Sequence, residues 1–323
     1  MNENEDITLT SSQAALLLQV HESSVKRWSN TGELKLGKTA GGHRRIRFDD
    51  LLEFCRVHEV KADLLFFAPH EEEVARAAFD ARERGDFTGV RELILRFCDT
   101  ETPRWLVNLI RYLDGVFGIP MARLFDAGVA GALGEVGRQW QSGSRTIALE
   151  HRFTQKILDA LHGILNAIEE EELTRAAEAP DAPRPPHAIV GCSEACHHEI
   201  GVFMARILLR RAGWTVTYLG ANVPYEEIAG IQELERARLV CISFALPLGP
   251  GDVRRCLKVL NALRAPQHPY DLVVGGLPFA AGTEAQYETD IPLSFAVSME
   301  AFERWAKSRH SPAYARPLME VTA

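Results

Sequence analysis

The stretch that decides the fold is AIVGCSEACHHEIGVFMARILLRR, residues 188–211. An apolar run at 188–192 leads into a polar loop, and an amphipathic segment follows at 199–211. Such a pattern predicts a buried strand, then a loop, then a helix. The rest of the carboxyl-terminal part repeats this order. Further strands are expected at 215–219, 239–244, 272–275 and 294–297, and further helices at 225–236, 252–265 and 299–308.

Strands that alternate with helices predict a doubly wound parallel α/β sheet of the flavodoxin-like type. In such sheets, ligands bind beyond the carboxyl ends of the strands. The loop after the first strand holds His198, and Gly201 follows at the start of the helix. Ser243 lies at the end of the third strand, and Gly275 and Gly276 lie at the end of the fourth. These residues are therefore candidates for a binding site.

The 323 residues are enough for two or three domains. Helical periodicity predicts a four-helix bundle over residues 69–174, with helices near 71–84, 86–98, 104–115, 121–140 and 145–172. Four prolines between residues 175 and 187 predict an extended linker, because proline breaks helices. We therefore divide the chain into an amino-terminal domain at 1–68, the helical bundle at 69–174, the linker at 175–187 and the α/β domain at 188–323.

The composition is that of an ordinary globular protein, with 46% hydrophobic and 25% charged residues. No apolar run approaches the ~20 residues that span a bilayer, and the first residues show no secretory signal. Six cysteines without dense spacing favour a reducing, cytoplasmic location. The net charge is −8, yet residues 21–47 carry seven Lys or Arg against two acidic residues, a local charge of +5. A basic head on an acidic chain is typical of a DNA-binding module.

The basic region has the pattern of a winged helix-turn-helix. One helix is expected at 8–18, a second from residue 23 or 24 to residue 30, and two wing strands at 34–36 and 43–48. The second helix would enter the major groove, and the wing would contact phosphates. The residues expected to contact DNA are Ser24, Lys26, Arg27, Gly42, His43, Arg44 and Arg45.

Residues 20–51, VHESSVKRWSNTGELKLGKTAGGHRRIRFDDL, resemble the head of MerR-type regulators. The most specific part is the run Gly41-Gly42-His43-Arg44-Arg45, in which two glycines allow a tight turn close to a phosphate. The resemblance implies that the head binds operator DNA, as a dimer on a pseudo-palindromic site.

A second group of residues lies where two helices of the predicted bundle meet, in WQSGSRTIALEH, residues 140–151. Ser142 and Gly143 interrupt the helix after Trp140, and Glu150 and His151 fall in the first turns of the next helix. One aromatic and two polar side chains are thereby gathered at one end of the bundle, where they could close over a flat ligand. The spacing Trp-x9-Glu-His resembles the capping motif of the CarH/LitR-like cobalamin photoreceptors. The resemblance implies that Trp140, Glu150 and His151 cover the upper face of adenosylcobalamin.

The α/β domain carries a matching resemblance. His198-x-x-Gly201, Ser243 and Gly275-Gly276 are similar to the signature of cobalamin-binding domains. The resemblance implies that His198 is the lower axial ligand of cobalt, and the positive end of the following helix favours the neutral imidazole. The glycines would leave room for the nucleotide tail of the cofactor, and Ser243 would offer a hydroxyl to the displaced base.

Two residues depart from the family pattern. Cys196 stands where the family has Asp or Glu two residues before the ligand, and Gln141 stands where light-sensing relatives have His after the cap Trp. Together with Cys192 and His198, Cys196 also forms a cluster of soft metal ligands. A MerR-type metal sensor that uses Cys192, Cys196 and His198 therefore stays open as an alternative.

The resemblances imply a cytoplasmic, light-responsive transcriptional regulator, a repressor, with adenosylcobalamin as its chromophore. Photolysis of the cobalt–carbon bond would change a dimer or tetramer of the chain and release operator DNA. The protein is not expected to be an enzyme or to bind a membrane. A regulator that senses cobalamin or another tetrapyrrole without photolysis is the second open alternative.

Overall fold

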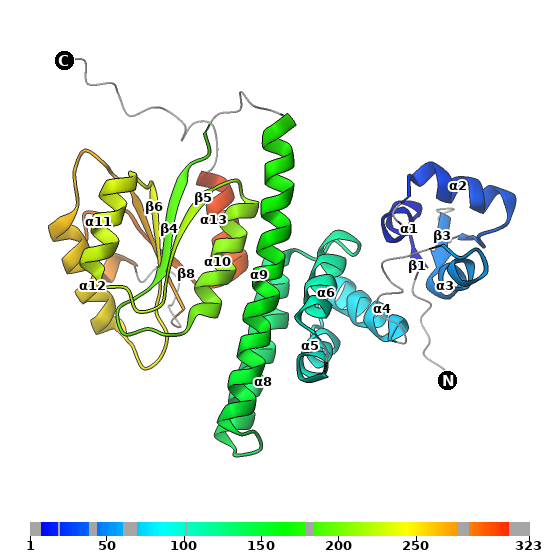
Figure 1. Ribbon diagram of the computed structural model, residues 1–323, viewed down its shortest axis with the longest axis horizontal. Helices are drawn as coiled ribbons and strands as arrows, with labels where there is room; N and C mark the ends of the chain where they lie inside the picture. The colour runs from blue at the N-terminus through cyan, green and yellow to red at the C-terminus, as the bar shows by residue number, and fades with distance from the viewer. Residues whose placement is uncertain are drawn as a thin grey trace. The chain divides into compact units, whose positions relative to one another are not determined.

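A computed structural model describes residues 8–18, 20–38, 44–60, 70–100, 102–178, 184–276 and 284–309. The chain forms two compact units, residues 1–156 and 157–323, and the division falls inside the long helix α9 (Ile147–Glu178) (Figure 1). Helix α9 takes in residues 175–178 of the predicted linker. Within the described ranges, no helix has both the length and the apolar character needed to cross a membrane.

The amino-terminal domain packs three helices against a small antiparallel sheet, which confirms the helix-turn-helix prediction. The helices are α1 (Ser11–Leu17), α2 (Glu22–Thr31) and α3 (Phe48–Val57). The strands are β1 (Thr8–Leu9), β2 (Gly37–Lys38) and β3 (Arg44–Arg47), in the order β1-β3-β2. Val25 of α2 and Ile46 of β3 are fully buried between them.

Two boundaries of this domain differ from the sequence prediction. The first two residues of the expected first helix form β1 instead, because they pair with β3. Helix α1 begins after Thr10, whose hydroxyl accepts a hydrogen bond from the N–H of Gln13 at 3.1 Å. The first wing strand is β2 and not 34–36, because Leu34 is buried and its N–H bonds back to α2.

The described residues between 71 and 156 are mostly helical, as the sequence predicts. Helix α4 (Glu71–Phe79) continues into a π-helical segment (Asp80–Arg84), and α5 (Thr88–Thr100) and α6 (Pro103–Gly115) follow. A second π-helical segment (Leu124–Val129) joins α7 (Met121–Arg123) to α8 (Ala130–Gln141). A short turn then leads from α8 into α9.

The carboxyl-terminal unit is built on a five-stranded parallel sheet, which confirms the doubly wound prediction. The strands are β4 (His187–Cys192), β5 (Thr215–Gly220), β6 (Leu239–Ser243), β7 (Asp271–Gly275) and β8 (Leu293–Ala296). Their order is β5-β4-β6-β7-β8, and each neighbouring pair is parallel. Each strand lies within two residues of its predicted bounds, and the largely buried strands β4, β6 and β7 are plain apolar runs.

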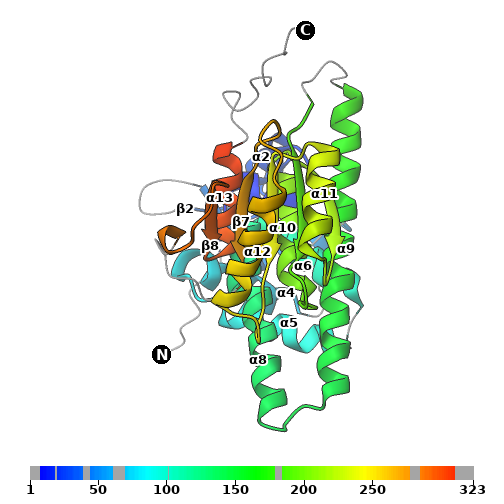
Figure 2. The same ribbon diagram turned by 90° about the vertical axis from the view of Figure 1, so that its left-hand side faces the viewer.

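Helices cover both faces of this sheet (Figures 1 and 2). Helices α10 (Glu199–Arg211) and α13 (Met299–Arg309) lie on one face, and α11 (Tyr225–Glu235) and α12 (Pro250–Leu263) lie on the other. The part of α9 from residue 157 onward packs on α10. There, Glu169 and Glu172 pair with Arg206 and Arg210.

Candidate functional site

The strand order creates a topological switch point between β4 and β6. Strand β4 has β5 on one side and β6 on the other, so the connections that leave β4 and β6 run in opposite directions. The register sets Cys192, Ser243 and Gly275 side by side at the carboxyl ends of β4, β6 and β7. The loop that carries His198 and the strand end that carries Ser243 therefore meet at one edge of the sheet.

Hydrogen bonds fix the loop that follows β4. The N–H of Ser193 donates to the carbonyl of Ser243 at 2.9 Å, which ties the loop to β6. Asn222, after β5, accepts from the N–H of Ala195 through Oδ1 at 2.8 Å and donates its own N–H to the carbonyl of Cys196 at 2.8 Å. Ala195 has a φ of +62°, which is uncommon for a residue with a side chain. The loop is thus held from both sides before it reaches His198.

His198 is the residue at which this loop becomes α10. It is the N-cap of the helix, with φ and ψ of −92° and 86°, and its side chain makes no capping hydrogen bond. The residue is exposed, like its neighbour His197. The imidazole of His198 is therefore available to a ligand at the switch point.

The predicted glycines have different structural roles. In the described part of the chain, a Cβ on Gly201 would have Ser243 Oγ as its nearest contact, at an ordinary 3.9 Å, so α10 presents a glycine towards Ser243. Gly276 has a φ of +89°, and a Cβ there would overlap the carbonyl oxygen of Phe244. A Cβ on Gly275 would touch the Ala296 side chain at 3.4 Å. Gly276 is thus required by the backbone itself, whereas an alanine at Gly201 would meet Ser243 in ordinary contact.

Two buried cysteines lie near this loop, Cys192 at the end of β4 and Cys196 within the loop. A hydrogen bond with Cys192 is the main reason why the pKa of the Cys196 thiol lies below its usual value. Glu194, the nearby acid of this loop, pairs instead with Arg255 of α12 at 2.9 Å. Over the described ranges, no three His, Cys, Asp or Glu side chains gather in a way that could hold a metal ion. The metal-sensor hypothesis for Cys192, Cys196 and His198 gains no support from these contacts.

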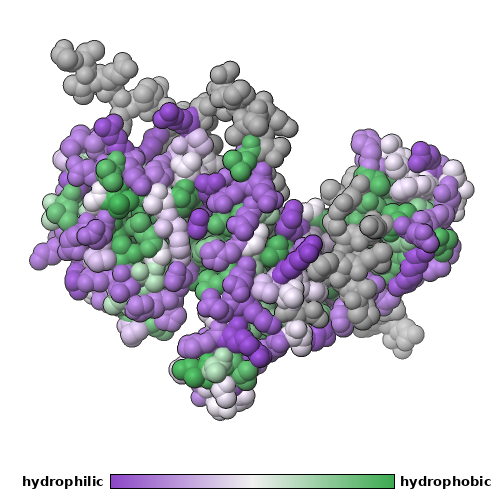
Figure 3. Space-filling view, in the orientation of Figure 1, coloured by the Kyte–Doolittle hydropathy of each residue, from purple (hydrophilic) through white to green (hydrophobic). Residues whose placement is uncertain are grey.

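In the amino-terminal unit, the predicted capping residues lie at the turn between α8 and α9. Trp140 is 47% exposed near the end of α8, and Ile147 and Leu149 are exposed at the start of α9. Figure 3 shows hydrophobic surface at this turn, surrounded by hydrophilic surface. Large apolar side chains with this exposure mark a surface that is suited to a partner or a ligand.

The polar capping residues lie in the first turns of α9. Thr146 caps the helix, because its Oγ1 accepts from the N–H of Leu149 at 3.3 Å. Glu150 Oε2 and His151 Nδ1 are 2.7 Å apart, and Thr154 donates its hydroxyl to Glu150 Oε1 at 2.8 Å. The carboxylate of Glu150 is thereby oriented by two neighbours on its own helix.

The residues predicted to contact DNA fall on two elements of the helix-turn-helix. Lys26 and Arg27 are exposed on α2, where Lys26 pairs with Glu22 at 3.0 Å. The others within described elements are Ser24 on α2 and Arg44 and Arg45 on β3. Gly42 and His43 lie outside the described residues.

Two protein families match the two ends of the chain. Residues 8–56 match a helix-turn-helix domain, and residues 186–303 match the B12 binding domain. The chain carries a B12 binding domain. This match covers the whole switch point, from the start of β4 into α13, and together with the helix-turn-helix match it confirms the resemblance drawn from the sequence.

Two similar proteins are repressors of Myxococcus xanthus. The HTH-type transcriptional repressor CarA is 38% identical over 96 residues, which are 30% of this chain and 32% of CarA. The HTH-type transcriptional repressor CarH is 34% identical over 119 residues, which are 36% of this chain and 35% of CarH. The chain therefore matches about a third of the length of each relative.

A solved structure supports the fold. The monomethylamine corrinoid protein of Methanosarcina barkeri superposes with a TM-score of 0.50 and 15% identity, over 68% of this chain and 95% of that one. At this identity the likeness concerns the fold, a helical region joined to a parallel sheet.

The switch point of the B12 binding domain fits a corrinoid with a nucleotide tail. Gly201 places no side chain beside Ser243, as a tail between strand and helix requires. His198 is exposed, and its side chain makes no capping hydrogen bond at the start of α10. A ring nitrogen of its imidazole suits a transition metal such as cobalt. Cys196 is engaged with Cys192, and no described hydrogen bond joins it to the imidazole.

Sequence reasoning missed three residues that fix these segments. Asn222 has a φ of +51°, and Asn is among the few residues that adopt this conformation readily, so an Asn in a short loop was a usable signal. Asp99 and Arg145 form an ion pair at 2.9 Å across 46 positions of sequence. No local pattern connects residues that far apart.

Proposed function

We propose that the chain is a light-responsive, adenosylcobalamin-dependent transcriptional regulator, a repressor that acts in the cytoplasm. The observation that carries the proposal is the switch point of the B12 binding domain, where His198, Gly201 and Ser243 meet. The helix-turn-helix match and the repressor relatives support the link to DNA.

The residues of the B12 binding domain would hold the lower side of the cofactor. His198 would ligate cobalt through its exposed imidazole. The space beside Gly201 would admit the nucleotide tail, and the hydroxyl of Ser243 would hydrogen-bond to it. Gly276 allows the chain after β7 to approach Phe244 and Ser243 at the end of β6 closely, while Gly275 packs against Ala296 of β8.

The turn between α8 and α9 would act on the upper side. Trp140 would offer an aromatic surface to the upper ligand, and Glu150 and His151 would offer polar atoms. Adenosylcobalamin supplies a cobalt–carbon bond that visible light breaks. After illumination, Trp140 and Glu150 would lose the group that they contact in the dark. A difference in contact of this kind is what a two-state switch requires.

The head would report this switch to DNA. Lys26 and Arg27 on α2 would reach the major groove, while Arg44 and Arg45 on β3 would contact the backbone. A dimer or tetramer would set the spacing of the heads on the operator. Each head of the oligomer adds its own phosphate contacts to the DNA complex. Disassembly in the light would therefore weaken DNA binding steeply.

The test is an absorption spectrum of the purified chain with adenosylcobalamin, before and after green light. We expect a protein-bound corrinoid in the dark, a histidine-ligated spectrum and a spectral change on illumination. His198→Ala should lose the histidine-ligated spectrum, whereas His197→Ala, at an equally exposed neighbour, should keep it. A wild-type chain that binds no corrinoid would contradict the proposal, and binding without a light-induced change would favour a sensor without photolysis.

A further inference from the structure

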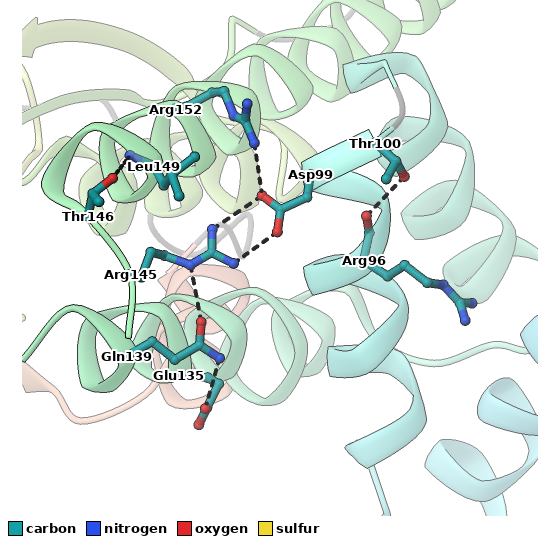
Figure 4. A network of polar contacts seen from close by, with 9 residues as sticks. All are labelled: Arg96, Asp99, Thr100, Glu135, Gln139, Arg145, Thr146, Leu149 and Arg152. Atoms are coloured by element: carbon teal, nitrogen blue, oxygen red, sulfur yellow. Dashed lines mark hydrogen bonds and ion pairs between the residues drawn. The ribbon is translucent and has the colours of Figure 1, made fainter. Parts of the chain in front are cut away.

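The turn between α8 and α9 is fixed by an arginine that the proposed function does not use. We call residues 140–151 the cap turn. Arg145 of this turn donates through Nη1 and Nη2 to the two carboxylate oxygens of Asp99 on α5, at 3.2 and 2.9 Å (Figure 4). Its Nε donates to Oε1 of Gln139 on α8 at 3.1 Å. One guanidinium therefore joins the cap turn to two helices, in the bidentate geometry that gives strong, oriented pairs.

The pair is sheltered and is reinforced by its neighbours. The side chain of Arg145 is 13% exposed and that of Asp99 is 31% exposed. Arg152 of α9 approaches the same carboxylate at 3.6 Å. Hydrogen bonding from Arg145 holds the pKa of Asp99 below its usual value. A pair of this kind is screened less than one on the open surface, so it can fix a local geometry.

The backbone of the cap turn also forms a hydrogen bond with Gln139. The carbonyl of Gln139 accepts the N–H of Arg145 at 3.1 Å and the hydroxyl of Ser142 at 3.0 Å. The side-chain amide of Gln139 donates to Glu135 at 3.1 Å (Figure 4). Gln139 directly precedes Trp140, so the bonds that hold Arg145 also hold the backbone next to the indole.

Two of the capping side chains, those of Trp140 and His151, are largely exposed, whereas Glu150 is held by neighbours on its own helix. Trp140 is 47% exposed, and the side chain of His151 is 72% exposed. Arg145 lies five residues from Trp140 and five from Glu150, in the middle of the turn that separates them. The relative placement of Trp140 and Glu150 therefore depends on the turn that Arg145 anchors to Asp99.

We propose that Asp99 and Arg145 are positioning residues that preform the cap turn, so that the site prefers a cobalamin whose upper group can contact Trp140 and Glu150. The inference rests on the proposed function and deepens it, because it assigns upper-ligand selectivity to a pair that touches no ligand. A preformed turn has already lost the conformational entropy that a loose turn would lose on binding. In a variant without the pair, the cap turn would lose this conformational entropy when it binds a large upper group. A small upper group would not order the turn, so its binding would not carry that cost.

The test compares adenosylcobalamin with cyanocobalamin, which differ in the upper group alone. Affinities of the full chain for both are measured in the dark by titration. The ratio of the two affinities is the readout, because a general loss of structure lowers both and leaves the ratio unchanged. We expect Asp99→Asn and Arg145→Gln to lower the preference for adenosylcobalamin by about tenfold, with little change for cyanocobalamin.

Two further variants sharpen the comparison. Arg145→Lys keeps the charge but loses the two-pronged geometry, so its ratio should fall between wild type and Arg145→Gln. Arg84→Gln is the matched control, because Arg84 is an exposed arginine that pairs with Asp80 at 3.0 Å and takes no part in the contacts of the cap turn described above. Its ratio should equal that of wild type.

A second readout needs no cofactor. Hydrogen exchange of the cofactor-free chain should be faster across the cap turn in Asp99→Asn than in wild type, and unchanged in Arg84→Gln. If Asp99→Asn leaves either the hydrogen exchange of the cap turn or the affinity ratio unchanged, the inference is wrong. The proposed function would still stand. A wild-type chain that binds neither cobalamin would overturn the proposed function and the inference with it.

Discussion

Gly201 offers the sharpest test of where the nucleotide tail lies. Gly201→Ala adds one methyl group to α10, at 3.9 Å from Ser243 Oγ, where no described atom obstructs it. Alanine is favoured over glycine in a helix by up to about 1 kcal/mol, so the cofactor-free protein should be as stable as wild type or more so. If the tail fills this space, the same methyl overpacks the bound state by about 1–3 kcal/mol. That corresponds to a loss of affinity of about 5- to 150-fold.

The matched control is Gly230→Ala. Gly230 lies in α11 and is exposed, and a Cβ there would meet nothing within 4 Å among the described residues. Both variants gain helix propensity, but only one fills the space beside Ser243. Urea unfolding of the cofactor-free proteins gives their stabilities, and titration with adenosylcobalamin in the dark gives their affinities. If Gly201→Ala binds as tightly as Gly230→Ala, the tail does not pass between α10 and Ser243, and the assignment fails.

Three other changes test separate parts of the account. Gly276→Ala should cost at least about 3 kcal/mol in urea unfolding, because a left-handed φ and a backbone overlap add up; wild-type stability would refute the close approach. Arg44→Ala should weaken DNA binding and lower its salt dependence by about one phosphate contact; an unaltered salt slope would remove Arg44 from the backbone contacts. Because Arg145 lowers the pKa of Asp99, their pair stabilises the fold above about pH 4 and is lost as the pH falls through the lowered pKa. Asp99→Asn should therefore flatten the acid limb of the stability curve, and a limb as steep as that of wild type would contradict this.

Much of the fold could be predicted because its signals are local. Buried parallel strands such as 239–243 are plain apolar runs, and α10 has its predicted bounds because its amphipathic pattern is continuous. The boundaries of the elements in the amino-terminal domain were harder to predict. The segment Thr8–Leu9 pairs with a strand more than thirty residues away, and that pairing overrides the helical pattern which continues from it.

The residues of the candidate site also differ in how well the sequence could place them. Ser243 and Gly275 could be placed together because parallel strands end at one edge of a sheet, and their register bears this out. The role of Gly276 could not be separated from that of Gly201, because the difference depends on the carbonyl of Phe244 in three dimensions. Asp99 gave no signal, because its partner lies 46 positions away.

In the proposed function, the upper group of a bound cobalamin controls the assembly of this chain. Sedimentation velocity of the adenosylcobalamin-loaded protein, followed at the visible absorbance of the corrinoid, tests it most directly. We predict that in the dark the corrinoid sediments with an oligomer of the chain, and that after green light it sediments with a smaller species. A corrinoid that sediments free of protein in the dark, or a boundary that light leaves unchanged, would contradict the account.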